Sequence, residues 1–278
     1  MVKKFFEFIF FSSIFISLCA VALCIETNLL LHLPLNEFSF YSFIFGATLL
    51  QYNLHYLFKK PAGKSSDRLA WSQMNKTTHC LLITTGIIPV IMSLFSFGIY
   101  QFIFLFVSGI ITLLYTVPVL PFKSKKRIKD FGILKIVTLA LIWTLVTVWF
   151  PAGQEANTGS FQLIFAGRFI FIFILCLVFD MRDVGVDSIE NIRTIPLIAG
   201  RQNAYRIIYF FLLLFILISL LQYFSTKNFI QFNAMLISAF ATFFVVKISR
   251  KQHSDFFYLA CIDGMMLLQA ILVIIDSN

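Results

Sequence analysis

Apolar residues run along the chain in long blocks, and polar or turn-forming residues separate one block from the next. Nine blocks have spanning or near-spanning length, at about 5–25, 38–58, 79–97, 99–119, 133–151, 161–179, 205–224, 228–247 and 255–275. A membrane-spanning helix needs roughly 20 apolar residues, whereas the strands of a membrane barrel alternate over short segments. The pattern therefore predicts an all-α polytopic membrane protein in which residues 1–278 form one transmembrane domain of nine helices.

Composition supports a location in lipid. Hydrophobic residues make up 59% of the chain and charged residues 13%, which is too apolar for a soluble globular protein. A net charge of +9 can indicate nucleic-acid binding. Here, however, the Lys and Arg residues lie between the apolar blocks, where they would face anionic lipid headgroups. We therefore expect membrane lipid, and no nucleic acid, next to these charges.

The distribution of basic residues predicts the orientation. If the N-terminus is cytoplasmic, all but two of the 22 Lys and Arg residues fall on the cytoplasmic side, the exceptions being Arg168 and Lys227. Cytoplasmic segments of membrane proteins carry an excess of Lys and Arg. We expect a bacterial inner (cytoplasmic) membrane, with the N-terminus in the cytoplasm and the C-terminus outside.

The first apolar block also resembles a signal peptide. It follows Lys3 and Lys4, and Ala20 and Ala22 offer a small-x-small cleavage site. Against cleavage, the block is close to full spanning length, and its removal would disturb the charge asymmetry. We expect the block to be retained as the first helix.

Three carboxylates follow the sixth block, at its predicted cytoplasmic end. Asp180, Asp183 and Asp187 are spaced by three and four residues, so on a helix they share one face. Carboxylates on one face suit a hard cation such as magnesium, which keeps waters that a phosphate-bearing substrate can displace. Alternatively, they only balance nearby Arg residues at a membrane surface, which requires no ligand. Because carboxylates are unfavourable at the hydrocarbon boundary, the pattern favours a site.

This region also resembles a known family. Residues 179–187, followed by Arg193-Thr194-Ile195-Pro196 and Gly200, resemble the second aspartate motif of the UbiA superfamily of intramembrane prenyltransferases. In that motif an Asp-x-x-x-Asp pair, often preceded by Arg, is followed by a Thr-Leu-Pro-like signature. The matching residues are Arg182, Asp183 and Asp187. Two further segments resemble the stretch over the family's fourth and fifth helices: Tyr115-Thr116-Val117-Pro118, and Gly132-Ile133-Leu134-Lys135 with Trp143.

The resemblance implies a fold and a reaction. The fold is a ring of helices around a central cavity that opens to lipid. In the reaction, magnesium ions on aspartates bind an isoprenyl diphosphate, and a lipophilic acceptor such as an aromatic ring attacks the allylic cation. The implied catalytic residues are Asp183 and Asp187, which with Asp180 are also the implied metal ligands. The implied diphosphate-binding residues are Asn53, Lys59, Tyr115, Lys135 and Arg182.

The chain departs from the family at the first aspartate motif. An Asn-x-x-x-Asp-x-x-x-Asp pattern is expected from Asn53 to Pro61, but Leu57 and Pro61 replace the two carboxylates. Neither side chain ligates a metal, so one of the two magnesium sites is expected to be missing.

Three functions remain open. In the first, the protein is a prenyltransferase in which Lys59, Lys60 or Lys64 binds phosphate directly in place of the second ion. In the second, it is a catalytically inactive relative that binds prenyl lipid or quinone, or serves a protein partner as an accessory membrane subunit. In the third, it moves a lipid or small solute across the membrane, although no paired internal repeat supports this.

Overall fold

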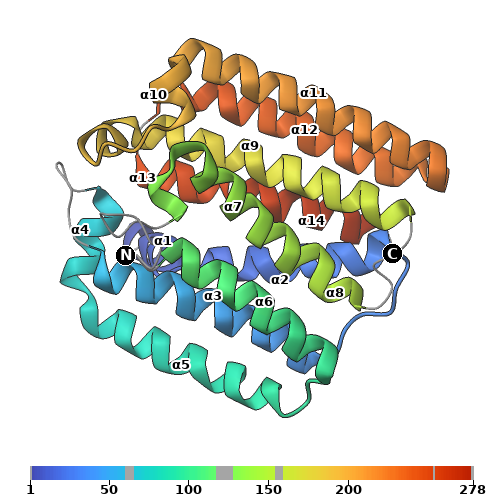
Figure 1. Cartoon of the computed structure of the whole chain (residues 1–278), viewed down its shortest axis with the longest axis horizontal. Helices are drawn as coiled ribbons and strands as arrows, with labels where there is room; N and C mark the ends of the chain where they lie inside the picture. The colour runs from blue at the N-terminus through green and yellow to red at the C-terminus, as the bar shows by residue number, and fades with distance from the viewer. Residues whose placement is uncertain (1, 60–65, 117–127, 154–158, 253, 277–278) are drawn as a thin grey trace. The chain divides into compact units, whose positions relative to one another are not determined.

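The computed structural model describes residues 2–59, 66–116, 128–153, 159–252 and 254–276. These residues form helices joined by short connections, with no strand in these ranges (Figure 1). Six helical stretches are long and apolar enough to cross a membrane: Lys76–Leu94, Gly132–Ala152, Gly159–Ile189, Arg201–Thr226, Phe229–Ser249 and Asp255–Asp276. A seventh is added if the bent pair Val2–Phe11 and Ile14–Leu30 counts as one span. The chain therefore has the character of an integral membrane protein.

Each of the nine predicted segments overlaps helical structure. For example, α3 (Phe38–Phe58) matches its predicted range, whereas α9 (Gly159–Ile189) continues well beyond its predicted end. Only six or seven segments are long and apolar enough to span a membrane, and α3 and the shorter apolar α6 (Ile99–Thr116) are not among them. The count of nine spans and the ring arrangement therefore stay predictions.

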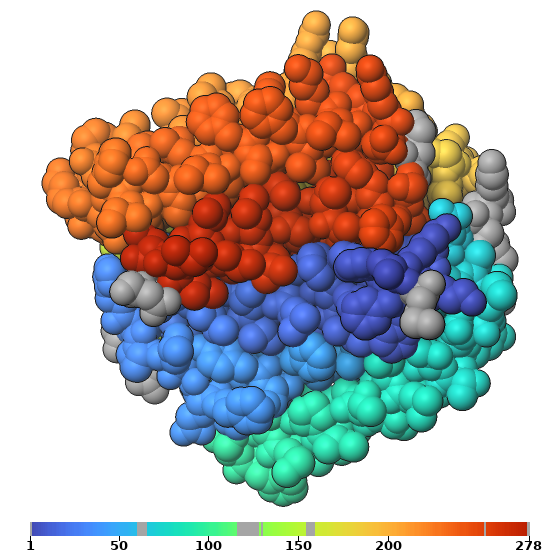
Figure 2. All heavy atoms as spheres, turned by 180° about the vertical axis from the view of Figure 1, so that it is seen from behind, coloured from blue at the N-terminus to red at the C-terminus, as the bar shows by residue number. Residues whose placement is uncertain are grey.

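The chain divides into two compact units, Met1–Phe97 with Val245–Asn278, and Gly98–Phe244. In the first unit, α2 (Ile14–Leu30) packs against both α3 and α14 (Gly264–Asp276). Figure 2 shows α14 lying along α2 on one face. The remaining helices of this unit are α1 (Val2–Phe11), α4 (Asp67–Met74), α5 (Lys76–Leu94), α13 (Asp255–Phe257) and a π-helical turn (Tyr258–Ile262).

Two glycines bring α3 and α5 into close contact. A Cβ atom on Gly46 would lie 2.6 Å from the carbonyl oxygen of Gly86 and 2.8 Å from the ring of Pro89. A Cβ on Gly86 would lie 3.0 Å from the carbonyl oxygen of Gly46. Small residues at such positions let helix backbones approach closely, and this is a main source of helix association in lipid. The Gly46–Gly86 contact thus sets the α3–α5 spacing.

A break separates α1 from α2. The two helices bend by 58° at Ser12 and Ser13, and Ser13 has a left-handed φ of 69°. Both serines are fully buried, so the backbone groups that the break frees need partners inside the protein. The Ser12 carbonyl accepts a hydrogen bond from Asn53 Nδ2 at 3.0 Å.

The second unit is built around α9. All residues from 170 to 178 are buried, as expected for a helix that is apolar on every side. Helix α9 packs against α11 (Arg201–Thr226) and against α7 (Gly132–Thr144). A π-helical turn (Leu145–Trp149) and α8 (Phe150–Ala152) continue α7, while α10 (Ile195–Ala199) follows α9. The last helix that belongs largely to this unit is α12 (Phe229–Ser249).

Candidate functional site

The candidate site begins with the length of α9. This helix has 31 residues and is therefore about 46 Å long, whereas the hydrocarbon core of a bilayer is about 30 Å thick. Its apolar part ends at Phe179, and the acidic motif forms the next turns of the same helix. We therefore expect the motif to lie where α9 leaves the hydrocarbon.

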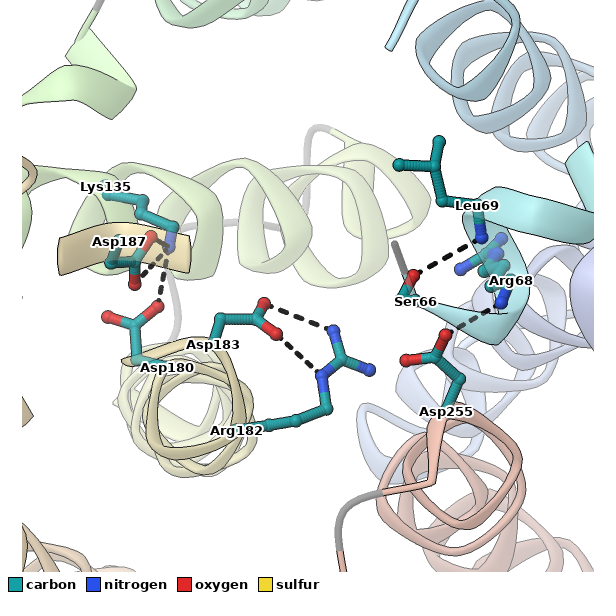
Figure 3. Close-up of polar contacts among 9 residues, drawn as sticks. All are labelled: Ser66, Arg68, Leu69, Lys135, Asp180, Arg182, Asp183, Asp187 and Asp255. Atoms are coloured by element: carbon teal, nitrogen blue, oxygen red, sulfur yellow. Dashed lines mark hydrogen bonds and ion pairs between the residues drawn. The ribbon is translucent and has the colours of Figure 1, made fainter. Parts of the chain in front are cut away.

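Helix geometry pairs Asp180 with Asp187. Residues seven apart on an α-helix return to within about 20° of the same direction. The two carboxylates accordingly meet one ammonium group from α7: Lys135 Nζ lies 2.9 Å from Asp180 Oδ1 and 3.1 Å from Asp187 Oδ1 (Figure 3). Only 4% and 5% of the two carboxylate side chains is exposed, so the three groups form a buried ionic cluster.

Asp183 does not join this cluster. Its carboxylate accepts two hydrogen bonds from the neighbouring Arg182 guanidinium, at 2.7 Å from Nε and 3.1 Å from Nη2. The Asp183 side chain is 34% exposed, against 5% for Asp187. Of the three carboxylates that the sequence places on one face, the structure thus brings two to Lys135 and turns the third to Arg182.

The backbone after α9 fixes the position of Asp187. Helix α9 ends in a Schellman motif in which Asn191 has a left-handed φ of 55°. In this motif the Ile192 N–H donates to the Asp187 carbonyl at 2.8 Å, and the Asn191 N–H donates to the Ser188 carbonyl at 3.2 Å. Asp187 is therefore held in the last regular turn of the helix.

A glycine fixes the position of Lys135. Gly132, the first residue of α7, lies directly against the backbone carbonyl of Arg193 and the backbone nitrogen of Thr194, and a Cβ atom would overlap that carbonyl. Lys135 lies one turn further along α7. The start of α7 and the segment after α9 are thus in backbone contact, which places the ammonium group beside the carboxylates.

The ionic cluster has the donor chemistry for a hard cation. Asp180 Oδ2 is buried without a hydrogen-bond partner, and two carboxylates face a single ammonium group. Magnesium is commonly held by one or two protein carboxylates together with substrate phosphate. In the described ranges no group of three or more His, Cys, Asp or Glu side chains is arranged to hold a metal ion. The residues present therefore fit a site of two carboxylates, Asp180 and Asp187.

Tyr115, another predicted diphosphate-binding residue, belongs to the second unit. It is half-buried near the end of α6, and none of the hydrogen bonds found in the described part of the chain involves its hydroxyl group. Val117 and Pro118, from the same family-like segment, lie outside the described residues.

The remaining predicted residues, Asn53 and Lys59, lie in the first unit. Asn53 is fully buried: its Nδ2 donates to the Ser12 and Leu49 carbonyls, and its Oδ1 lies 2.6 Å from His79 Nδ1. Lys59 is exposed at the end of α3. Lys60, Pro61 and Lys64 lie outside the described residues.

Sequence reasoning missed a second polar cluster, also in the first unit. Arg68 is buried, with Nη2 2.8 Å from Ser13 Oγ and its backbone N–H 2.8 Å from Asp255 Oδ2. In the sequence Arg68 counts only as one basic residue of a polar connection. No signal in the sequence pointed to its burial, because two serines within an apolar block do not by themselves predict a break whose freed backbone groups require polar partners.

Comparisons with known proteins agree with this architecture. The sequence profile of the UbiA prenyltransferase family matches residues 72–262. A solved structure from a study of digeranylgeranylglyceryl phosphate synthase in membranes has a similar fold, with a TM-score of 0.57 and 14% identity. That alignment covers 100% of this chain and 99% of the other. A search of curated protein sequences gives no match.

The matched region contains Lys135 and all three carboxylates of the motif, and it begins after the positions of the altered first motif. It spans well over half of the sequence. The chain belongs to the UbiA prenyltransferase family.

Proposed function

We propose that the protein is an intramembrane prenyltransferase that transfers an isoprenyl group from a diphosphate to an aromatic or other lipophilic acceptor. The observation that carries this proposal is the buried cluster of Lys135, Asp180 and Asp187 at the polar end of α9. Buried ionisable groups at membrane depth are expensive and usually functional. Membership of the family and the apolar helices support the choice of an isoprenyl substrate.

In this proposal the cluster holds the diphosphate end of the substrate. The Lys135 ammonium group donates hydrogen bonds to diphosphate oxygens and stabilises the negative charge that develops on the leaving group. Arg182, whose planar guanidinium group is bonded to Asp183 in the structure, would turn this group to the diphosphate. Release of Asp183 from Arg182 would let its carboxylate join Asp180 and Asp187 as a third ligand.

Asp180, Asp183 and Asp187 would hold a magnesium ion, which when bound supplies neutralisation of the diphosphate charge. In the transfer, the bond between the allylic carbon and the diphosphate oxygen breaks, and its electron pair leaves with the diphosphate. The acceptor's electrons then form the new bond to the allylic carbon, and an aromatic acceptor loses a proton. The apolar helices exclude water from the cation.

The test is binding of a radiolabelled long-chain isoprenyl diphosphate to the purified protein, with magnesium and with EDTA. Asp187→Ala and Asp183→Ala are expected to abolish magnesium-dependent binding, because each removes a proposed ligand. Glu190→Gln is the matched control, since this acid is exposed just after α9. Equal binding by wild type and both alanine variants would refute the site.

A second function is a binding protein without catalysis. It is favoured by Leu57, a described residue of α3 that replaces a carboxylate of the family's first motif. Such a protein would hold a prenyl lipid or a quinone, or support a protein partner as a membrane subunit. Product analysis with quinone-precursor acceptors separates the two: binding with product formation indicates the transferase, and binding without product indicates the binding protein.

A further inference from the structure

The first unit contains a buried positive charge without an anion. Arg68 is 5% exposed, and Ser13 Oγ, at 2.8 Å from Nη2, accepts the only hydrogen bond that its guanidinium group makes within the described ranges. The Nε atom is buried and has no partner. A buried charge is costly unless an opposite charge and hydrogen bonds compensate it. In the described part of the structure, the buried guanidinium group of Arg68 therefore lacks both a compensating negative charge and an acceptor for its Nε atom.

The nearby acid does not supply this negative charge. Asp255 Oδ2 accepts a hydrogen bond from the backbone N–H of Arg68 at 2.8 Å, and no salt bridge joins it to the guanidinium group in the described part of the chain. The next backbone N–H, of Leu69, donates to Ser66 Oγ (Figure 3). Asp255 and Ser66 thus cap the start of α4, whereas the guanidinium donors other than the one bonded to Ser13 Oγ remain available.

A second cation lies on the same aromatic ring. The Arg68 guanidinium carbon is 3.9 Å from the centre of the Tyr56 ring, and Lys59 Nζ is 5.5 Å from the same centre. The ring orients both groups through cation–π contacts, although it neutralises neither. Two positive charges near one ring make the local potential more positive, which attracts an anion.

We propose that Arg68 and Lys59 form a phosphate-binding site that needs no metal ion. The guanidinium group offers a planar fork of donors that matches two phosphate oxygens, and the flexible Lys59 ammonium group contributes a second charge. A phosphate oxygen at the guanidinium group supplies the buried Nε with an acceptor. The ligand is a phosphate or diphosphate group on a soluble molecule or on an amphiphile.

Sequence position gives the site a role. Lys59 lies between Leu57 and Pro61, which replace the carboxylates of the family's first motif, and Arg68 follows seven residues after Pro61. In the family's first motif, carboxylates hold a metal ion that binds the phosphate group. In this protein the Lys59 and Arg68 side chains would bind that group directly. The identity of this ligand as the isoprenyl diphosphate rests on the proposed function, whereas phosphate binding by Arg68 does not.

The experiment measures binding of radiolabelled inorganic pyrophosphate to the full-length protein in phosphatidylcholine nanodiscs containing EDTA. The wild type is expected to bind without metal. Arg68→Gln should weaken binding about tenfold or more, because it removes a charge-assisted contact, and Lys59→Gln should weaken it about threefold. Lys76→Gln is the matched control, because this exposed lysine starts α5 in the same unit.

Absence of binding in EDTA, or equal binding by wild type, Arg68→Gln and Lys59→Gln, overturns the proposal. If Arg68→Gln does not fold, pyrophosphate binding is measured with Arg68→Lys and Lys59→Gln instead. Arg68→Lys keeps the positive charge but loses the planar pair of donors, and Lys59→Gln changes an exposed residue. Unchanged binding by both variants overturns the site as well.

One further variant separates this proposal from the proposed function. Asp187→Asn is expected to keep metal-independent pyrophosphate binding while it loses magnesium-dependent binding of the isoprenyl diphosphate. Adding phosphatidic acid to the nanodiscs identifies the source of the phosphate. If phosphatidic acid lowers pyrophosphate binding in the wild type but not in Arg68→Gln, the natural ligand is a lipid headgroup. If phosphatidic acid leaves pyrophosphate binding unaltered, the ligand is a soluble diphosphate. Both results support the phosphate site.

Discussion

Lys135 of α7 lies 3.1 Å from Asp187 of α9, and this buried ion pair ties the two helices together at the end where the carboxylates gather. The same ammonium group reaches Asp180 at 2.9 Å. Because one cation serves two carboxylates, its removal leaves two buried negative charges close together. The cluster therefore contributes to the stability of the second unit as well as to its proposed chemistry.

Lys135→Met is expected to lower the free energy of unfolding by about 3 kcal/mol, the cost typical of breaking a buried ion pair from one side. Thermal unfolding in detergent measures this. Adding Asp187→Asn to Lys135→Met should recover part of the loss, because the double variant has one buried charge fewer. Magnesium should also raise the unfolding temperature of Lys135→Met more than that of the wild type. Identical unfolding temperatures for Lys135→Met and wild type would contradict the role of the pair.

Gly132→Ala is expected to disturb the contact between the start of α7 and the backbone at Arg193, because the added methyl group overlaps a carbonyl that cannot move away freely. We expect a loss of about 2 kcal/mol in stability, in the range of overpacked cores, together with weaker substrate binding through displacement of Lys135. Circular dichroism melting and diphosphate binding measure the two effects.

Gly185→Ala provides the control for this substitution. No heavy atom lies within 4 Å of a Cβ at Gly185, which is in the interior of α9. Alanine is favoured over glycine inside a helix by about 1 kcal/mol, so this variant should be as stable as the wild type or slightly more stable. If both alanine variants behave alike, close backbone contact at Gly132 is not what positions α7.

Asn53→Ala tests whether the predicted diphosphate-binding Asn53 has a structural role. Its amide group satisfies the Ser12 carbonyl and pairs with His79, so its loss leaves buried polar groups without partners. The expected cost is about 2 kcal/mol of stability. Pyrophosphate binding by the folded fraction should stay at the wild-type level. A stable variant that has lost binding would instead return Asn53 to the ligand site.

Gly46→Ala tests the close approach of α3 and α5. The added Cβ would meet the Gly86 carbonyl at 2.6 Å, so the helices must separate, and we expect a loss of about 1–3 kcal/mol. Gly109→Ala in α6 is the comparison, because its Cβ would have no heavy atom within 4 Å. Unfolding in detergent monitored by circular dichroism ranks the two variants. Equal stability of Gly46→Ala and Gly109→Ala would mean that α3 and α5 can move apart at this contact without cost.

Hydrophobic patterning predicted most helix positions because lipid imposes a long apolar segment on each spanning helix. It could not predict the bend at Ser12 and Ser13, since two serines alone do not interrupt an apolar block. Nor could it identify which helix lies deepest. Helix α9 is buried at every residue from 170 to 178, whereas α6 is equally apolar in sequence but has no buried residue among its described side chains.

The acidic motif was visible in the sequence, but its pairing was not. A spacing of three and four residues places Asp180, Asp183 and Asp187 on one face. Which two of them share a cation depends on Lys135, which lies 52 residues before Asp187, and on the competing Arg182. Arg68 carried no sequence signal at all, because its burial follows from packing between segments that are far apart in the chain.

The bend between α1 and α2 makes the first apolar block more than an interchangeable anchor. Its Ser12 carbonyl and Ser13 hydroxyl are used by Asn53 and Arg68, which lie 41 and 55 residues further along the chain. A fusion that substituted an unbroken hydrophobic helix for residues 2–30 would still insert into a membrane. It would nevertheless leave α3 and α4 without these acceptors, so exchanging the leading segment should yield protein that is inserted but misassembled.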